Sequence, residues 1–388
     1  MACAVPVRCF ERAGGASCFA VYIVSLPIFA IIIRRLRQNG NTPISDRIYL
    51  DHAATSPLRP EARAAMEEGF AIWANPSSPH AEGRKAKQAL EDARERVKKA
   101  LGWDGEVIFT SGASEALWIA LNRAKVDRRI VSAVEHDAVF RAAPDAEVVP
   151  VGANGTSDLS RISGFDRSVV AIQHVNSEVG LIQPVADLVP EIHATGGLLL
   201  CDCSQSAAKH ALPDADMAVI SAHKFGGPIG VAALLVKNYN LLDPIGGHER
   251  GYRQGTENLP GAMGMAAALD AWTRQPFDLV EEAFDRVHDE VFTSGGRIVD
   301  CGGNVSSFIH AFAHPIMKAQ ALLIRLDAMG FAVSAGSACS SGTLKKSRVL
   351  DAFGVDDDTA SRTIRVSIGW NTTPEELERF AEAWRKLT

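Results

Sequence analysis

The most constraining feature of this sequence is a regular alternation, from Tyr49 onward, of short β-branched runs with amphipathic stretches. Such alternation is typical of βα units, which build a mainly parallel sheet covered by helices. The runs predict strands at residues 107–110, 130–134, 148–151, 169–175, 198–202, 217–222 and 231–236. We therefore expect an α/β fold with one large, mainly parallel, seven-stranded sheet.

The stretches between these runs predict helices, and the pattern changes after Gly261. Residues 80–101 are charged on one face, and residues 184–195 begin with proline and end before two glycines. Helices at 262–274 and 279–293, strands near 305–312 and 364–368, and a last helix from Thr373 then indicate a smaller α+β domain. We expect a large domain over residues 61–260 and a small domain formed by 47–60 and 261–388.

The first 46 residues differ from the rest of the chain. Residues 13–33 carry no charge and are followed by Arg34 and Arg35. A stretch of that length can span a bilayer, and the arginines would keep the main body in the cytoplasm. No methionine lies between Met1 and Met66, so the segment is alternatively upstream sequence read from a mistaken start. A cytoplasmic protein is expected under both interpretations, with a membrane partner only under the first.

The net charge and the cysteine pattern limit the kinds of ligand that this chain is expected to bind. The formal net charge of -6 leaves no basic excess for binding nucleic acid, so a small-molecule substrate is favoured. The seven cysteines form no Cys-x-x-Cys pair and no Cys/His spacing typical of zinc, and we interpret them as reduced thiols. Cys201 and Cys203 flank an aspartate on a predicted strand, where alternation turns both toward one face. Apolar filling of the core is favoured there over a redox pair.

Small and reactive side chains follow five of the predicted strands. In open α/β sheets, ligands bind beyond the carboxyl ends of the strands. The segments at those ends are residues 111–115, 135–137, 176, 201–205 and 221–224. The sequence therefore predicts a site at this edge of the sheet.

Lys224, directly after a strand and among small residues, suits a lysine that forms a Schiff base with pyridoxal phosphate (PLP). Asp202 could keep the pyridinium nitrogen protonated, and His136 could lie over the ring. A phosphate cup could be formed by Ser114, Ser221 and His223. Each residue alone has a structural alternative, such as a surface lysine, a paired carboxylate or a core histidine. The whole set favours PLP.

The ordered motifs resemble the cysteine desulfurases, in the class V group of fold-type I PLP-dependent transferases. The resemblance runs from Tyr49 to the final helix and rests on residues 49–55, 75–80, 173–180, 221–224, 247–251 and 255–258. It implies conversion of L-cysteine to L-alanine, with the sulfane sulfur passed to an enzyme cysteine as a persulfide. That sulfur would supply iron–sulfur cluster or thiocofactor synthesis through a sulfur-acceptor protein, whose identity the sequence leaves open.

The resemblance also assigns roles to residues of the site. It implies that Lys224 is the Schiff-base lysine, that Asp202 pairs with the pyridinium nitrogen, and that Gln205 bonds the ring oxygen. His136 would stack on the ring and assist protonation, and Asn176 would contact both cofactor and substrate. The phosphate would be bound by Ser114, Ser221, His223 and, from the other subunit of a homodimer, Thr256.

Cys339 lies in a run of small residues, 334–343, which predicts an accessible loop. The alternative is a buried core thiol, because cysteine is often buried. A thiol on such a loop can take sulfur from the substrate and carry it outward. The run is similar to that of the NifS/IscS type, and there Cys339 would be the catalytic cysteine. Arg365 matches the arginine that binds the substrate carboxylate, which a guanidinium fork suits.

Two rival functions remain at this point. A selenocysteine lyase or another class V lyase or aminotransferase would use the same PLP site, although Cys339 argues against it. A membrane-tethered, non-catalytic interaction protein on a PLP-enzyme fold would explain residues 13–33. The intact set of Lys224, Asp202 and Arg365 argues against that second rival.

Overall fold

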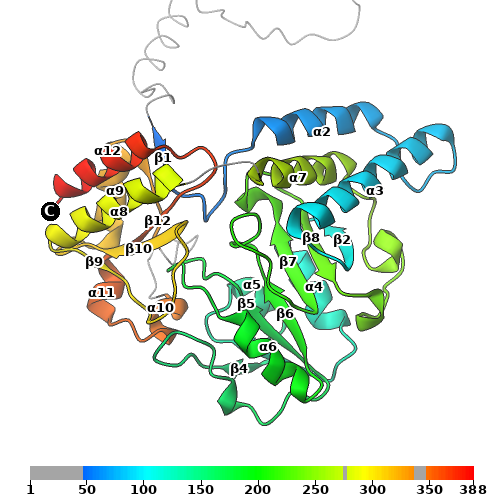
Figure 1. Cartoon of the computed structure of the whole chain (residues 1–388), viewed down its shortest axis with the longest axis horizontal. Coiled ribbons are helices and arrows are strands. Elements are labelled where there is room, and N and C mark those ends of the chain that lie inside the picture. The colour runs from blue at the N-terminus through cyan, green and yellow to red at the C-terminus, as the bar shows by residue number, and fades with distance from the viewer. Residues whose placement is uncertain (1–46, 274–277, 336–346) are drawn as a thin grey trace, which may run out of the picture. The chain divides into compact units, whose positions relative to one another are not determined.

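A computed structural model describes residues 47–273, 278–335 and 347–388, which belong almost entirely to the unit Ile48–Thr388. Its largest element is the predicted seven-stranded sheet, with the strand order β2-β8-β7-β6-β5-β3-β4 (Figure 1). The strands are β2 (Glu106–Thr110), β3 (Arg128–Ser132), β4 (Glu147–Val149), β5 (Ser168–Gln173), β6 (Leu198–Asp202), β7 (Met217–Ser221) and β8 (Ala232–Val236). Only β8 runs against its neighbours, so the mainly parallel α/β fold is confirmed.

The central strands are buried on both faces because their side chains alternate between two apolar cores. In β5, Val170 and Ile172 pack into one core, whereas Val169 and Ala171 pack into the other. A strand that is covered on both sides needs apolar residues at every position, which explains the continuous apolar runs. Helices cover both faces: α2 (Pro60–Ile72), α3 (Ala81–Leu101), α4 (Ala113–Arg123), α5 (Asp137–Ala142), α6 (Val185–Ala194) and α7 (Leu259–Trp272).

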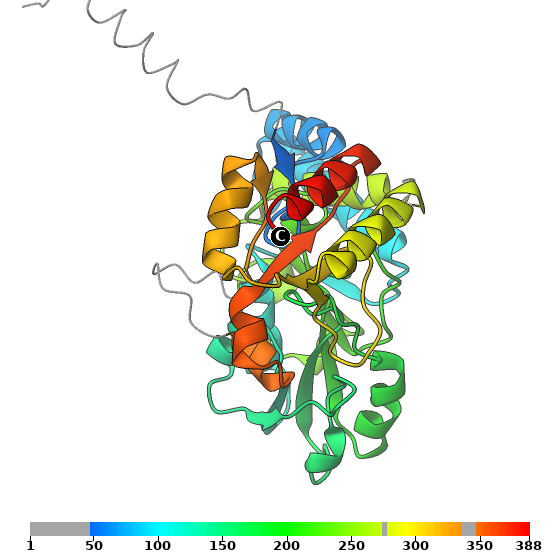
Figure 2. The same ribbon diagram turned by 90° about the vertical axis from the view of Figure 1, so that its left-hand side faces the viewer.

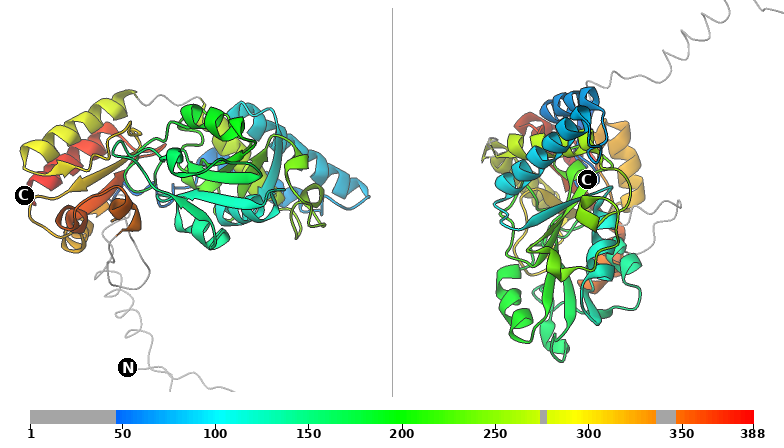
Figure 3. Two further views of the ribbon diagram at one scale, coloured as in Figure 1. Left: turned by 90° about the horizontal axis from the view of Figure 1, so that it is seen from below. Right: turned by 90° about the vertical axis from the view of Figure 1, so that its right-hand side faces the viewer.

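The C-terminal third forms a second sheet, of antiparallel strands in the order β12-β10-β9. Figures 2 and 3 show these elements, coloured yellow to red, gathered beside one end of the large sheet. The elements are α8 (Asp278–Thr293), β9 (Arg297–Ile298), β10 (Ile309–Ala313), α9 (Ala319–Ala328), β11 (Phe331–Ala332), α10 (Arg348–Ala352), α11 (Asp357–Arg362), β12 (Thr363–Ser367) and α12 (Pro374–Arg385).

The start of the described chain joins this C-terminal group. Strand β1 (Ile48–Tyr49) pairs in parallel with β11, and Asp51 forms a bridge with Ser367. This pairing accords with the expected grouping of residues 47–60 with 261–388. The division into two domains stays a prediction, since Ile48–Thr388 forms one compact unit.

Several predicted strands end earlier or begin later than expected. Strand β3 ends at Ser132 because the Glu135 amide donates to the Ser132 carbonyl (3.2 Å) and closes a turn. Strand β10 begins only at Ile309, because the Ser306 hydroxyl accepts a hydrogen bond from the Phe308 amide (3.3 Å). In both cases a local turn replaces the end of an apolar run.

No helix among the described residues is both long and apolar enough to cross a bilayer. The anchor expected at residues 13–33 lies outside the described residues.

Candidate active site

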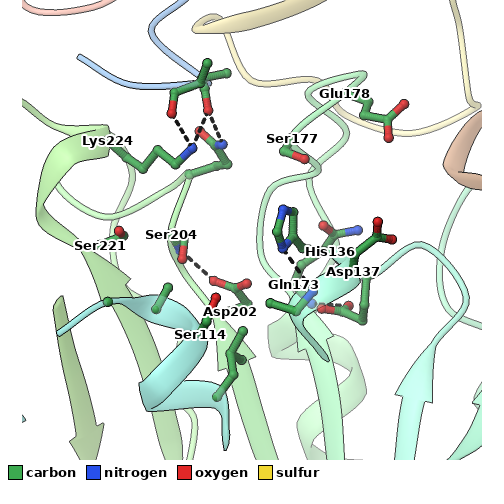
Figure 4. A pocket seen from close by; sticks show the side chains of 18 of the residues that line it. Ser114, His136, Asp137, Gln173, Ser177, Glu178, Asp202, Ser204, Ser221 and Lys224 are labelled. Carbon is green, nitrogen blue, oxygen red and sulfur yellow. Dashed lines mark hydrogen bonds between the residues drawn. The ribbon is translucent and has the colours of Figure 1, made fainter. Parts of the chain in front are cut away.

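A cavity of about 740 Å³ opens at the carboxyl edge of the large sheet, where the residues after β2, β3, β5, β6 and β7 meet. The predicted convergence of five strand ends is therefore present in the structure. Figure 4 shows Lys224 and Ser221 on one side of the cavity, His136 on the other and Asp202 between them. Eight of the predicted residues line it: Ser114, His136, Asp202, Gln205, Ser221, His223, Lys224 and Arg365.

Lys224 ends the single 3₁₀ turn that follows β7. Its Nζ donates hydrogen bonds to the carbonyls of Ala53 (2.6 Å) and Ala54 (2.8 Å). Burial, together with the charge of Arg365, lowers the pKa of Lys224 to about 8. A lysine with this pKa is uncharged more often near neutral pH than an exposed lysine, so it is a better nucleophile.

Asp202 is the last residue of β6, and its Oδ1 accepts a hydrogen bond from the Ser204 amide (2.9 Å). Gln205 donates from Nε2 to the Ala53 carbonyl (2.9 Å). Gln205 Oε1 and Ser204 Oγ are buried and have no hydrogen-bond partner among the described residues. Because buried polar atoms are normally satisfied, these two atoms beside the cavity indicate a polar ligand.

His136 caps α5, and its Nδ1 accepts a hydrogen bond from the Ala138 amide (3.2 Å). Nδ1 is therefore unprotonated, and the proton of the neutral ring lies on Nε2. Burial lowers the pKa of His136, although the charge of Asp202 opposes that shift. The result is a neutral, flat ring facing the cavity, which suits stacking on an aromatic cofactor.

The other end of the cavity is built to hold an anion. Helix α4 has Gly112 at its N-cap and no side-chain cap, so the amides of Ala113 and Ser114 at its start are available to a ligand. His223 Nδ1 lies 3.1 Å from Thr55 Oγ1, and burial lowers the pKa of His223 to about 4, with the charge of Lys224 adding to the effect. A neutral His223 can still donate one hydrogen bond to a phosphate oxygen.

An amine, a carboxylate, a flat ring and an anion-binding helix end thus surround one cavity. These are the four groups that PLP requires, and the unpaired Gln205 Oε1 and Ser204 Oγ add polar contacts for a ring. The residues present therefore fit PLP.

Arg365 reaches the cavity from the middle of β12. Its Nη1 donates to the Ser177 carbonyl and its Nη2 to Asp51 Oδ1, both at 2.8 Å. Its Nε is buried and unpartnered among the described residues. Asp51 also accepts from Ser334 Oγ (2.8 Å), so it holds the guanidinium in place. Sequence reasoning gave Asp51 no role, because nothing in the opening motif reveals a partner more than three hundred residues away.

Glu135 is a second residue that sequence reasoning missed, although it was noted beside His136. It is fully buried, and its Oε1 accepts a hydrogen bond from the Gln173 amide (2.6 Å). Burial raises the pKa of Glu135 well above its usual value, and the charge of Asp202 adds to the rise. Glu135 therefore keeps its proton to a higher pH than an exposed glutamate does. Its position directly after a buried strand was the available signal.

Three predicted residues are not brought into this cavity by the described part of the chain. Asn176 is buried, and its Oδ1 accepts from the amides of Glu178 (2.9 Å) and Val179 (3.0 Å), which closes a turn. Thr256 is exposed on the surface. Cys339 lies outside the described residues. The roles expected for these three stay predictions.

Cys201 and Cys203 are free thiols, fully buried in the core, as the interpretation as apolar filling expects. Burial alone would raise the pKa of Cys203, but the neighbouring Cys201 and His174 side chains favour its thiolate and lower that pKa below its usual value. The residues that the structure describes contain no group of three or more His, Cys, Asp or Glu side chains able to hold a metal ion.

Comparison with known proteins gives the family. Residues 48–380 match the aminotransferase class-V family. The chain is 33% identical to the cysteine desulfurase IscS of Dictyoglomus turgidum over 88% of this chain and 96% of that protein. It is also 33% identical to a cysteine desulfurase of Cereibacter sphaeroides, over 87% and 94% of the two chains.

Solved structures agree with the sequence relatives. A NifS-like protein from Rickettsia africae superposes with a TM-score of 0.79 at 27% identity, over 88% of this chain and 99% of that one. The site described above, with its fit to PLP, is the feature these comparisons lead one to expect. This chain therefore belongs to the aminotransferase class-V family of PLP-dependent enzymes, and within it to the cysteine desulfurases.

Proposed function

We propose that this cavity converts L-cysteine to L-alanine and passes the sulfur to Cys339. The observation that carries the proposal is the meeting of Lys224, Asp202, His136 and Arg365 at one cavity. In the reaction, the Cβ–S bond of the substrate breaks and an S–S bond forms on the enzyme thiol. L-cysteine and one thiol thereby give L-alanine and one persulfide, with no outside oxidant.

Lys224 would hold the cofactor aldehyde and move the proton at the substrate Cα. Its pKa of about 8 supports both tasks, because the amine can accept and release a proton near neutral pH. Asp202 would keep the cofactor ring nitrogen protonated, and Gln205 would bond the ring oxygen. When bound, PLP supplies an electron sink that weakens the substrate C–S bond.

His136 would lie on the face of the cofactor ring, and its protonated Nε2 would be the hydrogen-bond donor of the neutral imidazole. Ser114, Ser221 and His223 would hold the phosphate together with the amides at the start of α4. Asn176 would act in the same site, where its Nδ2 donates to the Val134 carbonyl (3.3 Å) and its Oδ1 accepts from the Val179 amide (3.0 Å).

Arg365 would bind the substrate carboxylate. Its Nε is the guanidinium donor that Asp51 and Ser177 leave unpartnered, and it is already buried beside the cavity. A carboxylate at this position would satisfy a buried charged donor, which favours amino-acid substrates over amines.

The protein would act as a homodimer, in which Thr256 of each subunit completes the phosphate site of the other. The exposure of Thr256 and its absence from the cavity of its own chain support this arrangement. The persulfide would then serve a sulfur-acceptor protein of iron–sulfur cluster or thiocofactor synthesis.

The test uses purified protein loaded with PLP and given L-cysteine. We expect one molecule of L-alanine for each molecule of L-cysteine consumed. Alkylation and peptide mass spectrometry should then find an added sulfur on Cys339. Cys339→Ser should bind PLP normally but release no sulfur, because a hydroxyl is a far weaker nucleophile than a thiolate. Wild-type turnover by Cys339→Ser, or the sulfur on another cysteine, would refute the assignment. Sedimentation of an active monomer would refute the dimer.

A further inference from the structure

Arg348, the first residue of α10, contacts the turn between β3 and α5 through both terminal nitrogens of its guanidinium group. Nη1 donates to the Ala133 carbonyl, and Nη2 donates to the Glu135 carbonyl and to Asp137 Oδ1 (3.2 Å). The guanidinium carbon also lies 4.1 Å from the centroid of the Phe140 ring, in α5. One side chain from the C-terminal region therefore binds this turn at several points.

These contacts bracket His136, because Glu135 and Asp137 are its two neighbours in the chain. His136 has its own hydrogen bond, from the Ala138 amide to Nδ1, which fixes how the ring is turned. That bond does not fix where the turn itself lies relative to the cavity. The hydrogen bond from the Gln173 amide to Glu135 is one part of that second constraint, and the bonds from Arg348 to the residues on both sides of His136 are another.

Helix α10 is a firm support for Arg348. Ser347 accepts hydrogen bonds from the amides of Val349 (3.1 Å) and Leu350 (3.2 Å) and so caps the helix. The same hydroxyl donates to Glu178 Oε2 (2.6 Å) at the turn after β5. Val349 and Leu350 are buried, so the helix is anchored independently of Arg348.

We infer that Arg348 is a positioning residue that holds His136 in place at the cofactor-binding cavity. The inference rests on the proposed role of His136 at the cofactor ring. A planar guanidinium can serve acceptors on two edges while its face lies on an aromatic ring, which a lysine ammonium cannot do. Arg348 also lines the cavity, but its hydrogen bonds go to the residues on either side of His136.

The test is a double-mutant cycle in which the dissociation constant of PLP is measured by titrating apoprotein. Arg348→Met should weaken PLP binding about tenfold, the effect of losing roughly one charge-assisted hydrogen bond. His136→Ala should weaken it at least as much. The double variant should bind PLP no more weakly than His136→Ala alone, because Arg348 acts through His136.

Arg362→Met is the matched control. Arg362 also donates to two carbonyls, those of His314 and Pro315, and to the carboxylate of Asp358, but it does not line the cavity. Its loss should leave PLP affinity unchanged. Arg348→Lys, which keeps the charge and is the milder change, should weaken PLP binding about threefold, since roughly half of the lost binding free energy is recovered.

The outcomes separate the inference from the proposal beneath it. If His136→Ala leaves PLP affinity unchanged, the proposed role of His136 fails. If His136→Ala weakens binding while Arg348→Met and Arg348→Lys do not, only the inference on Arg348 fails. Losses that add in the double variant would also overturn it, because a residue acting through His136 cannot add to the loss of His136.

Discussion

The large parallel sheet and the C-terminal antiparallel sheet both contribute to the cavity, but in different ways. From the parallel sheet, Asp202 and Lys224 arrive because they follow strands that end at the same edge. From the antiparallel sheet, Arg365 arrives from the middle of a strand and is held by Asp51 at 2.8 Å. Parallel strand ends place chemistry by topology alone, whereas the second region depends on individual polar contacts.

This difference has a mechanical consequence. Asp202 ends β6, and Ser221, just before the turn that carries Lys224, ends β7. Both strands are hydrogen-bonded to a neighbouring strand on each side, which fixes these two residues in place. Arg365 and Arg348 are fixed by side-chain bonds to Asp51, Asp137 and carbonyl groups. We therefore expect substitutions in the two regions to fail differently: loss of the cofactor chemistry in the first, and loss of positioning in the second.

The largest effect should come from the parallel sheet, with Lys224→Ala. Without its amine the protein should lose covalently held PLP, and alanine formation should fall by a factor on the order of 10³ or more. Visible absorbance after gel filtration and an alanine assay measure both. Lys237→Ala is the control, since that lysine pairs with Asp104 and Asp214 on the surface. Substantial turnover by Lys224→Ala would remove the basis for the comparison.

The next largest effect should appear in the C-terminal sheet, where the free energy of unfolding should depend on pH. Burial lowers the pKa of His310 to about 4, so between pH 6.5 and 4 the unfolded chain binds a proton that the folded chain does not. Falling pH should therefore destabilise the fold through this residue by up to about 3 kcal/mol. Above pH 6.5 His310 is neutral in both the folded and the unfolded chain, and this destabilisation is absent.

His310→Phe should lessen that dependence, because a phenyl ring does not titrate and can still lie against Phe284, whose ring centroid is 4.1 Å from that of His310. Unfolding by urea at a series of pH values gives the slope. An unchanged slope in His310→Phe would show that acid sensitivity arises elsewhere.

A smaller effect is expected from Arg365→Lys, which keeps the charge but loses the fork. The Michaelis constant for L-cysteine should rise roughly thirtyfold while kcat and PLP affinity change little, because only carboxylate binding is weakened. Steady-state kinetics and PLP titration separate these quantities, and Arg362→Lys serves as the control. A fall in PLP affinity would instead show that Arg365 contributes to cofactor binding, as the residues of the parallel sheet do.

The smallest effect should follow Cys203→Ala. The Cys201 and His174 side chains lower the pKa of Cys203, yet its side chain is fully buried, so access rather than pKa decides its reactivity. Alanine production should stay within about twofold of wild type, since a thiol-to-methyl change removes little buried volume. In the native protein, Cys201 and Cys203 should also resist alkylation. Their rapid labelling would show that this part of the sheet opens to solvent.

Much of the site was predictable because its residues follow strands directly. Ser114, His136, Asp202, Ser221 and Lys224 could each be named from one predicted strand end, without knowing which strands are neighbours. Asp51 and Arg348 could not be named, because their partners lie far away in the chain and no periodic pattern relates them. The turn that ends β3 was also missed, because an apolar run does not reveal where a local backbone bond will close.

The sequence by itself determined the α/β class, the large parallel sheet and the edge that carries the chemistry, since apolar alternation and strand direction are local properties. Only the tertiary structure decided how Arg365 and Arg348 approach that edge. Arg365 is paired with Asp51, and its buried Nε has no partner among the described residues. Arg348 donates hydrogen bonds to Glu135 and Asp137, the two neighbours of His136. Such contacts depend on how two separately formed sheets pack together, and hydrogen-bond partners across that packing leave no trace in local sequence pattern.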